Sequence, residues 1–144
     1  MDEHSLKMIE LELAILIRRT TSVTTNKRLW NLDRSAYLLL RRIASKGPVG
    51  VKVLAGEFKL DISTVSRQAA ALEKKDYLYK IPDPIDGRAY SFQITEQGKT
   101  ELHNHMKHRL ERITELLEDW PDEDCEVFGE LLKKFNQAYP KLMD

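Results

Sequence analysis

The chain has 144 residues, enough for one domain with a substantial hydrophobic core and too few for two independent ones. Hydrophobic residues make up 42% and charged residues 32%, as in soluble globular proteins, and no apolar run approaches the ~20 residues of a membrane span. The single cysteine, Cys125, excludes an intramolecular disulfide framework, and the acidic start lacks the basic segment of a signal peptide. We therefore expect a cytoplasmic protein with no membrane association.

The net charge of zero hides an uneven distribution of charge along the chain. Residues 1–17 carry one Lys and four acids (net −3), residues 18–92 fifteen Lys+Arg and seven acids (net +8), and residues 93–144 seven and twelve (net −5). A basic middle segment can present a positive face to nucleic-acid phosphates while the whole chain stays neutral. Ordinary solvated helix surfaces can produce the same asymmetry, so charge alone does not decide the function.

The first half of the chain is predicted to be helical. Residues 5–25 form one helix, because apolar residues recur there at helical spacing. A second helix follows Asp33, a favourable N-cap residue, and ends at Gly47. Val49 can pair briefly as a strand before a third helix over residues 51–58. The positions expected to be buried in the second and third helices are Ala36, Leu39, Leu40, Ile43, Leu54, Ala55 and Phe58.

The fourth predicted helix has one apolar and one polar face. Asp61 is expected to cap it, and its apolar positions Ile62, Val65, Ala69 and Leu72 are expected to face inward. The outer side and flanks carry hydroxyl, guanidinium and amide groups, which can read a DNA major groove. These groups belong to Ser63, Thr64, Ser66, Arg67 and Gln68, and Lys74 falls on the same outer side as Ser63 and Arg67. Any amphipathic surface helix shows such a separation of faces, so this helix alone is not decisive.

A β-hairpin is predicted next, with strands over residues 77–81 and 89–94. Tyr90, Phe92 and Ile94 share one face of it. The turn between the strands is rich in Pro and Asp and projects Arg88, with Asp86 expected to orient the guanidinium group. An Arg at the tip of a hairpin can reach the minor groove beside the major groove that a helix reads.

The C-terminal part is predicted to be two helices. Thr95 caps the first, which runs to about residue 119, and Pro121 begins the second, with acids at its positive end. Together they carry more apolar surface than a small head can bury, which favours dimerisation. The apolar positions are Leu102, Met106, Leu110, Ile113, Leu116, Leu117, Trp120, Phe128, Leu131, Leu132, Phe135 and Tyr139.

This order of elements resembles the MarR family of bacterial transcriptional regulators over essentially the whole chain. The runs that carry the resemblance are residues 54–55, 63–67, 72–75, 86–89 and 94–98. The sequence departs from the family at Asp76, where such proteins usually have glycine, although Asp tolerates the left-handed conformation of a helix end. It also departs at Lys80, where the family often has Arg; a lysine there can contact a phosphate but offers no bidentate pair.

The resemblance implies a mainly α fold with a small β-hairpin wing, within one domain of residues 1–144. Residues 33–94 would be the winged helix-turn-helix core, and residues 1–30 and 95–144 the dimerisation helices. The implied function is a homodimeric, sequence-specific regulator that binds a pseudo-palindromic operator in double-stranded DNA, a repressor released by a small-molecule ligand. The residues expected to contact DNA are Ser63, Thr64, Ser66, Arg67, Gln68, Lys80, Asp86 and Arg88.

Family members commonly hold small aromatic molecules where the dimer base meets the winged head. The candidate lining residues here are Trp30, Leu32, Tyr37 and Met106, although aromatic residues at helix boundaries are also ordinary core residues. This leaves a possible aromatic effector as one interpretation and simple packing as the other.

Other functions find less support in the sequence. His105 and His108 lie three residues apart near Glu101 and Glu111, but exposed helix histidines explain them better than zinc does, so no metal or cofactor is expected. Cys125 lies among acids that oppose thiolate formation, which favours an incidental thiol. No phosphate-binding loop, metalloprotease motif or nucleophile elbow indicates an enzyme. The alternative from another class is a winged helix that binds proteins and not DNA.

Overall fold

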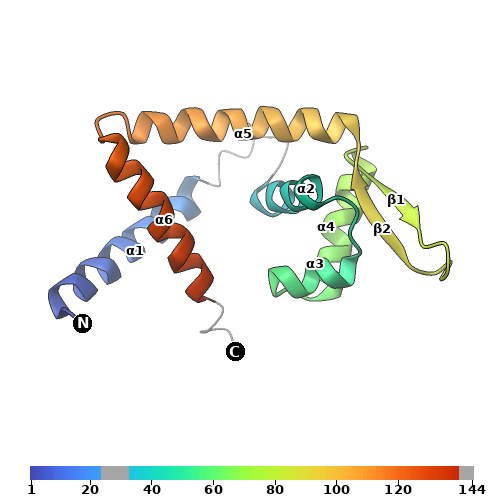
Figure 1. Cartoon of the computed structure of the whole chain (residues 1–144), viewed down its shortest axis with the longest axis horizontal. Helices are drawn as coiled ribbons and strands as arrows, with labels where there is room; N and C mark the ends of the chain where they lie inside the picture. The colour runs from blue at the N-terminus through green and yellow to red at the C-terminus, as the bar shows by residue number, and fades with distance from the viewer. Residues whose placement is uncertain (24–32, 140–144) are drawn as a thin grey trace. The chain divides into compact units, whose positions relative to one another are not determined.

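A computed structural model describes residues 1–23 and 33–139 of the chain. Helices and a single hairpin make up this part (Figure 1), which confirms the predicted mainly α fold with a β-hairpin wing. The elements are α1 (Glu3–Val23), α2 (Arg34–Lys46), α3 (Val51–Phe58), α4 (Ile62–Lys74), β1 (Leu78–Pro82), β2 (Tyr90–Ile94), α5 (Glu96–Leu116) and α6 (Asp122–Ala138). The chain divides into two compact units, Met1–His105 and Met106–Asp144.

Helix α1 begins two residues earlier than predicted, and its predicted last two residues lie outside the described part. Asp2 caps it, since its carboxylate accepts hydrogen bonds from the His4 N–H at 3.2 Å and the Ser5 hydroxyl at 2.8 Å. Most of its apolar residues are nevertheless exposed in the single chain. They are Leu6, Met8, Ile9, Leu11, Leu16 and Ile17.

Helices α2, α3 and α4 supply most of the core of the first unit. The carboxylate of Asp33 accepts the Ala36 N–H at 2.8 Å, so the predicted N-cap of α2 is confirmed. Gly47 ends the helix with φ of 81°, a conformation that favours glycine. Ala36 and Phe58 are only half-buried, and Tyr37 is buried in addition to the predicted positions. The central buried residues of these helices are Leu39, Leu40, Ile43, Leu54, Val65, Ala69 and Leu72.

The prediction that Ile62 faces inward is wrong. Its side chain is 53% exposed, because it is the first residue of α4 and lies beyond the inward stripe that begins at Val65. Asp61 occupies the N-cap position as expected, but it makes no side-chain cap bond; its backbone carbonyl instead accepts the Val65 N–H at 3.2 Å. The turn before it uses Lys59 in the left-handed conformation, with φ of 56°.

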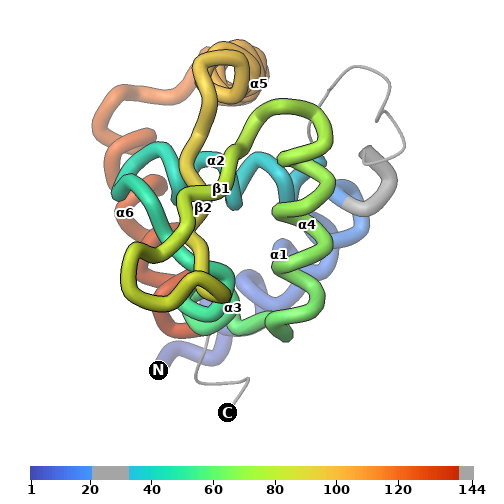
Figure 2. Tube along the Cα trace, turned by 90° about the vertical axis from the view of Figure 1, so that its right-hand side faces the viewer, coloured from blue at the N-terminus to red at the C-terminus, as the bar shows by residue number. Residues whose placement is uncertain are grey.

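The hairpin is antiparallel and its strands lie close to the predicted ranges. Leu78 pairs with Ile94 and Pro82 with Tyr90 at the two ends of the register. The predicted brief pairing of Val49 is also confirmed, because it bridges to Phe92 through two backbone hydrogen bonds of 2.8 and 3.2 Å. Helix α4 packs beside β1, and α2 beside β2 (Figure 2).

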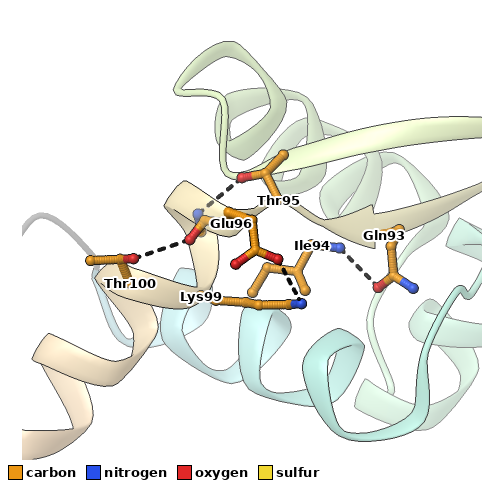
Figure 3. Close-up of polar contacts among 7 residues, drawn as sticks. Gln93, Ile94, Thr95, Glu96, Lys99 and Thr100 are labelled. Carbon is orange, nitrogen blue, oxygen red and sulfur yellow. Dashed lines mark hydrogen bonds and ion pairs between the residues drawn. The ribbon is translucent and has the colours of Figure 1, made fainter.

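One junction joins the end of α4, the hairpin and the start of α5. Asp76 has φ of 64°, so the left-handed turn expected in place of glycine is confirmed. The hydroxyl of Thr95 donates to the Asp76 carbonyl at 2.6 Å and accepts the Gly98 N–H at 2.9 Å, which makes Thr95 the cap of α5. Figure 3 shows Thr95 at the start of this helix, just before Glu96. A Cβ atom on Gly98 would lie 2.3 Å from the backbone oxygen of Tyr77. Only glycine fits there.

The second unit contains the rest of α5 and all of α6. Trp120 and Phe128 pack edge to face with ring centres 5.4 Å apart. No residue of α6 is buried, and its apolar side chains are exposed at Val127, Phe128, Leu131, Leu132, Phe135 and Tyr139. No helix within the described ranges is long and apolar enough to cross a membrane.

Candidate nucleic-acid interface

Helix α4 presents its polar side to solvent while its apolar side anchors it in the core. Val65, Ala69 and Leu72 are buried at the inner face, at the spacing that holds a helix in a fixed rotation about its axis. On the outer side Ser63 and Arg67 are exposed. The predicted neighbours Thr64, Ser66 and Gln68 are half-buried flanks of the same surface. The five predicted groups therefore share one anchored helix and one side of it.

The wing is an exposed loop stiffened by two aspartates. All residues from 83 to 89 are exposed. The Asp83 carboxylate accepts the N–H groups of Ile85 at 2.8 Å and Asp86 at 3.2 Å, and these two bonds hold the pKa of Asp83 below its ordinary value. These side-chain bonds explain why the turn needs aspartate at these positions.

Arg88 lies in this exposed turn, as predicted, but Asp86 plays a different part from the one expected. Its carboxylate accepts the backbone N–H of Arg88 at 3.0 Å, and its carbonyl accepts the Ala89 N–H at 3.0 Å. The sequence predicted a bond to the guanidinium group. Asp86 thus fixes the backbone that carries Arg88, and the cationic side chain extends from a shaped turn.

Lys80, another residue expected to contact DNA, lies at the base of the wing. Its Nζ atom is 3.7 Å from a carboxylate oxygen of Glu73 in α4 and 4.6 Å from the centre of the Tyr90 ring. Lys80 therefore contacts two side chains within the protein. Neither contact could be predicted from the spacing of residues in the sequence.

Further exposed cations lie on α3, on α4 and in the turn between them, and of these the sequence had placed only Lys74 on the outer side of the fourth helix. They are Lys52 in α3, Lys59 in the turn, and Lys74 and Lys75 at the end of α4. For the other three the sequence signal was the net charge of +8 over residues 18–92. Cations at such positions can add sequence-independent attraction to phosphate.

An ion pair joins the two helices that precede α4. The guanidinium of Arg42 in α2 binds both carboxylate oxygens of Glu57 in α3, at 2.5 and 2.9 Å. Hydrogen bonding from Arg42 is the main reason that the pKa of Glu57 lies below its ordinary value. This pair braces α3, the helix that precedes the turn into α4.

The four residues predicted to line a ligand pocket are not shown together. Trp30 and Leu32 lie outside the described residues, and Met106 is half-buried in the second unit. Tyr37 is buried, with its ring 4.8 Å from that of His105 and its hydroxyl accepting a 3.1 Å hydrogen bond from Arg41. An open hollow of about 490 Å³ lies elsewhere, at the turn between α5 and α6. Its lining includes Trp120, Pro121, Val127, Phe128 and Leu131.

The expectation that the histidines of α5 are exposed is wrong for one of them. His105 is only 6% exposed because it packs against Tyr37, whereas His108 lies on the surface with its Nδ1 atom 3.6 Å from Glu111. Within the described ranges no three His, Cys, Asp or Glu side chains are grouped to hold a metal ion. Cys125 is a half-buried free thiol.

Comparison with known proteins places this geometry in a family. The model of the MarR family matches residues 32–90. Over 139 residues the chain is 48% identical to YxaD of Bacillus subtilis (strain 168), described as an uncharacterized HTH-type transcriptional regulator, and the match covers 96% of this chain and 97% of YxaD. The HTH-type transcriptional regulator MgrA of Staphylococcus aureus is 25% identical over 97% of this chain and 99% of its own.

Solved structures share the fold. A MarR family protein from Bacillus stearothermophilus has a TM-score of 0.79 at 18% identity, over 97% of this chain and 99% of that one. Streptococcus pneumoniae FabT, in complex with DNA, has a TM-score of 0.75 at 17% identity, over 95% of this chain and 99% of FabT. Since its family and relatives are regulators and not enzymes, the chain is a DNA-binding transcriptional regulator of the MarR family.

Proposed function

We propose that the chain binds double-stranded DNA with α4 in the major groove and the wing in the adjoining minor groove. The observation that carries this proposal is the anchored helix α4, which turns Ser63 and Arg67 outward while Val65 holds its inner side in the core. A helix fixed in this way can present side chains to base edges in a constant register. FabT, a protein of the same fold, is known in complex with DNA, which supports DNA binding by this fold.

The contacts divide by chemistry. Arg67 and Gln68 can read base edges, since Arg pairs with guanine and Gln with adenine through two hydrogen bonds each. The hydroxyl groups of Ser63, Thr64 and Ser66 can bind either bases or phosphate. In the wing, Asp86 shapes the turn and Arg88 enters the minor groove.

We further propose that the active form is a homodimer on a pseudo-palindromic operator. Residues 33–94 would form each DNA-binding core, flanked by dimerisation helices within residues 1–30 and 95–144. The support comes from α1 and α6, whose apolar side chains are exposed along both helices in the single chain. Such surfaces are usually buried against a partner, and a twofold dimer is the commonest assembly.

As a regulator, the dimer would act in the cytoplasm as a repressor, released when a small aromatic molecule binds. The proposed lining of the effector site remains Trp30, Leu32, Tyr37 and Met106, of which Tyr37 is buried against His105. The test is transcription in vitro from a promoter that contains the operator: the protein should lower the yield, and an effector from a panel of phenolic acids should restore it. A rise in yield on adding the protein would make it an activator.

DNA recognition itself is tested by selecting bound sequences from a pool of random duplexes. We expect enrichment of an inverted repeat whose half-site centres are about one helical turn, or a multiple of it, apart. Light scattering of the complex should give two chains per duplex. Failure to retain any duplex at low salt would favour a winged helix that binds proteins, because even non-specific DNA binding is strong under those conditions.

A further inference from the structure

Lys80 lies on the face of the hairpin that turns toward the helices. In the register of the hairpin Lys80 is directly opposite Phe92, and Leu78 is opposite Ile94. Residues two apart on a strand share a face, and Leu78, Phe92 and Ile94 on this face are all buried. A lysine whose only role was to contact phosphate would be expected on the opposite face of the hairpin, which turns away from the helices.

The ammonium group of Lys80 has contacts to two different elements. It lies 3.7 Å from Glu73 in α4 and 4.6 Å from the centre of the Tyr90 ring in β2. The Tyr90 ring in turn packs edge to face on Phe92, with ring centres 5.4 Å apart. Lys80 therefore connects α4 to both strands at the base of the wing.

These contacts also draw Lys80 away from the surface that faces DNA in the proposed complex. Glu73 follows Arg67 by six residues, which places it about 9 Å further along α4. The polar group of residues 63–68 lies at the opposite, N-terminal end of the helix. An ammonium held at Glu73 is therefore directed toward the C-terminal end of α4, away from the polar group of residues 63–68.

We propose that Lys80 is a positioning residue that sets the angle between the wing and the recognition helix, and not a phosphate contact. The inference rests on the proposed reading of DNA by α4 and the wing. In the proposed complex α4 and the wing contact DNA at two separate places, so the angle between them has to stay constant. A shift of about 1 Å at either contact would weaken binding. The side chains of Lys80 and Glu73 remain 46% and 34% exposed, so each contact is weak and acts on geometry more than on overall stability.

The sharpest test is Glu73→Gln, because the two roles for Lys80 predict opposite signs. Removing an acid from a DNA-binding protein preserves or raises affinity if only charge matters, since DNA is a polyanion. Positioning predicts a loss instead, of about three- to fivefold, on a duplex that the full-length protein selects from a random pool. Lys80→Met should lose the same amount, the double variant no more than either single one, and Lys80→Arg should retain the affinity of the wild type.

A second readout does not depend on DNA. A fluorophore on Ile85→Cys, in a Cys125→Ser background, reports wing motion through its anisotropy, because Ile85 is 96% exposed. Glu73→Gln and Lys80→Met should lower the anisotropy, and Lys80→Arg should not. Lys74→Met is the matched control: it removes an equal charge from the same region of α4 and should leave the wing unchanged.

The outcomes separate the two proposals. If Lys80→Met lowers the salt dependence by about one unit of slope while Glu73→Gln preserves or raises affinity, Lys80 contacts phosphate and the positioning role is wrong. An anisotropy that is unchanged in both variants also overturns it. If no duplex is retained by the wild-type protein, the proposed reading of DNA fails, and the anisotropy still decides whether Lys80 holds the wing.

Discussion

At the scale of single residues, the function depends on side chains whose backbone is held by local bonds. Arg88 has its N–H bound by Asp86, and Arg67 lies on a helix fixed by the buried Val65 and Ala69. Gly98 allows the start of α5 to approach Tyr77 closely. In each case the position of the residue depends on contacts made by the residues around it.

Arg67→Ala should weaken binding to the selected operator by about 1–3 kcal/mol if the guanidinium pairs with a base. The measurement is the ratio of operator affinity to affinity for an unrelated duplex, which should fall. An equal loss on both duplexes would make Arg67 a phosphate contact, and the base reader would then have to be sought among Ser63, Thr64, Ser66 and Gln68.

Arg88→Ala should weaken binding most at operators flanked by A·T pairs, because a narrow minor groove concentrates negative potential. The salt dependence of binding should flatten by about one unit of slope. Circular dichroism should remain native, since Arg88 is exposed. If the affinity and the salt dependence are both unchanged while the spectrum is native, Arg88 does not contact DNA.

Gly98→Ala should destabilise the protein by about 1–3 kcal/mol, although alanine favours helices. The added Cβ would lie 2.3 Å from the backbone oxygen of Tyr77, so the junction must move. Gly56→Ala, in α3, is the control: nothing lies within 4 Å of its Cβ, and it should stabilise by about 0.5–1 kcal/mol. Urea unfolding at fixed protein concentration measures both, and similar values for the two variants would contradict the close approach.

At the scale of elements, the positions of the helices and strands could be predicted from the periodicity of apolar residues. The angles at which these elements pack depend on specific side-chain contacts. The second and third helices were predicted closely from Asp33, Gly47 and the apolar spacing. Ile62 was misplaced because a helix period does not show where the inward stripe begins. The contacts of Lys80 with Glu73 and Tyr90 join different elements, which sequence spacing cannot reveal.

The ion pair between α2 and α3 should make stability depend on acidity. Hydrogen bonding to Arg42 lowers the pKa of Glu57 in the folded state, so the pair stabilises the fold above the unfolded pKa of Glu57. That stabilisation is lost as pH falls through the lowered folded pKa. Glu57→Gln should therefore show a flatter loss of stability in the acidic range than the wild type, as measured by thermal unfolding across pH. Parallel curves for the two proteins would show that the pair does not contribute.

At the scale of the whole molecule, the exposed apolar helices are the main feature that a single chain leaves unexplained. Truncation after Asp119 removes α6 and should give aggregates or a weak monomer, because the remaining apolar residues of α5 stay exposed and the proposed base is lost. Size-exclusion chromatography with light scattering gives the measurement. A soluble dimer that still binds DNA would show that α6 is not needed for assembly.

The sequence by itself determined the order and type of the elements, the caps at Asp33 and Thr95, the left-handed turn at Asp76 and the MarR family. These features depend on spacing and conformational preference over a few neighbouring residues, which the sequence displays directly. Only the tertiary structure decided that His105 is buried against Tyr37, that Asp86 binds the backbone of Arg88, and that Lys80 contacts α4. Such contacts join side chains whose relative position is fixed by packing between elements, so no local pattern could contain them.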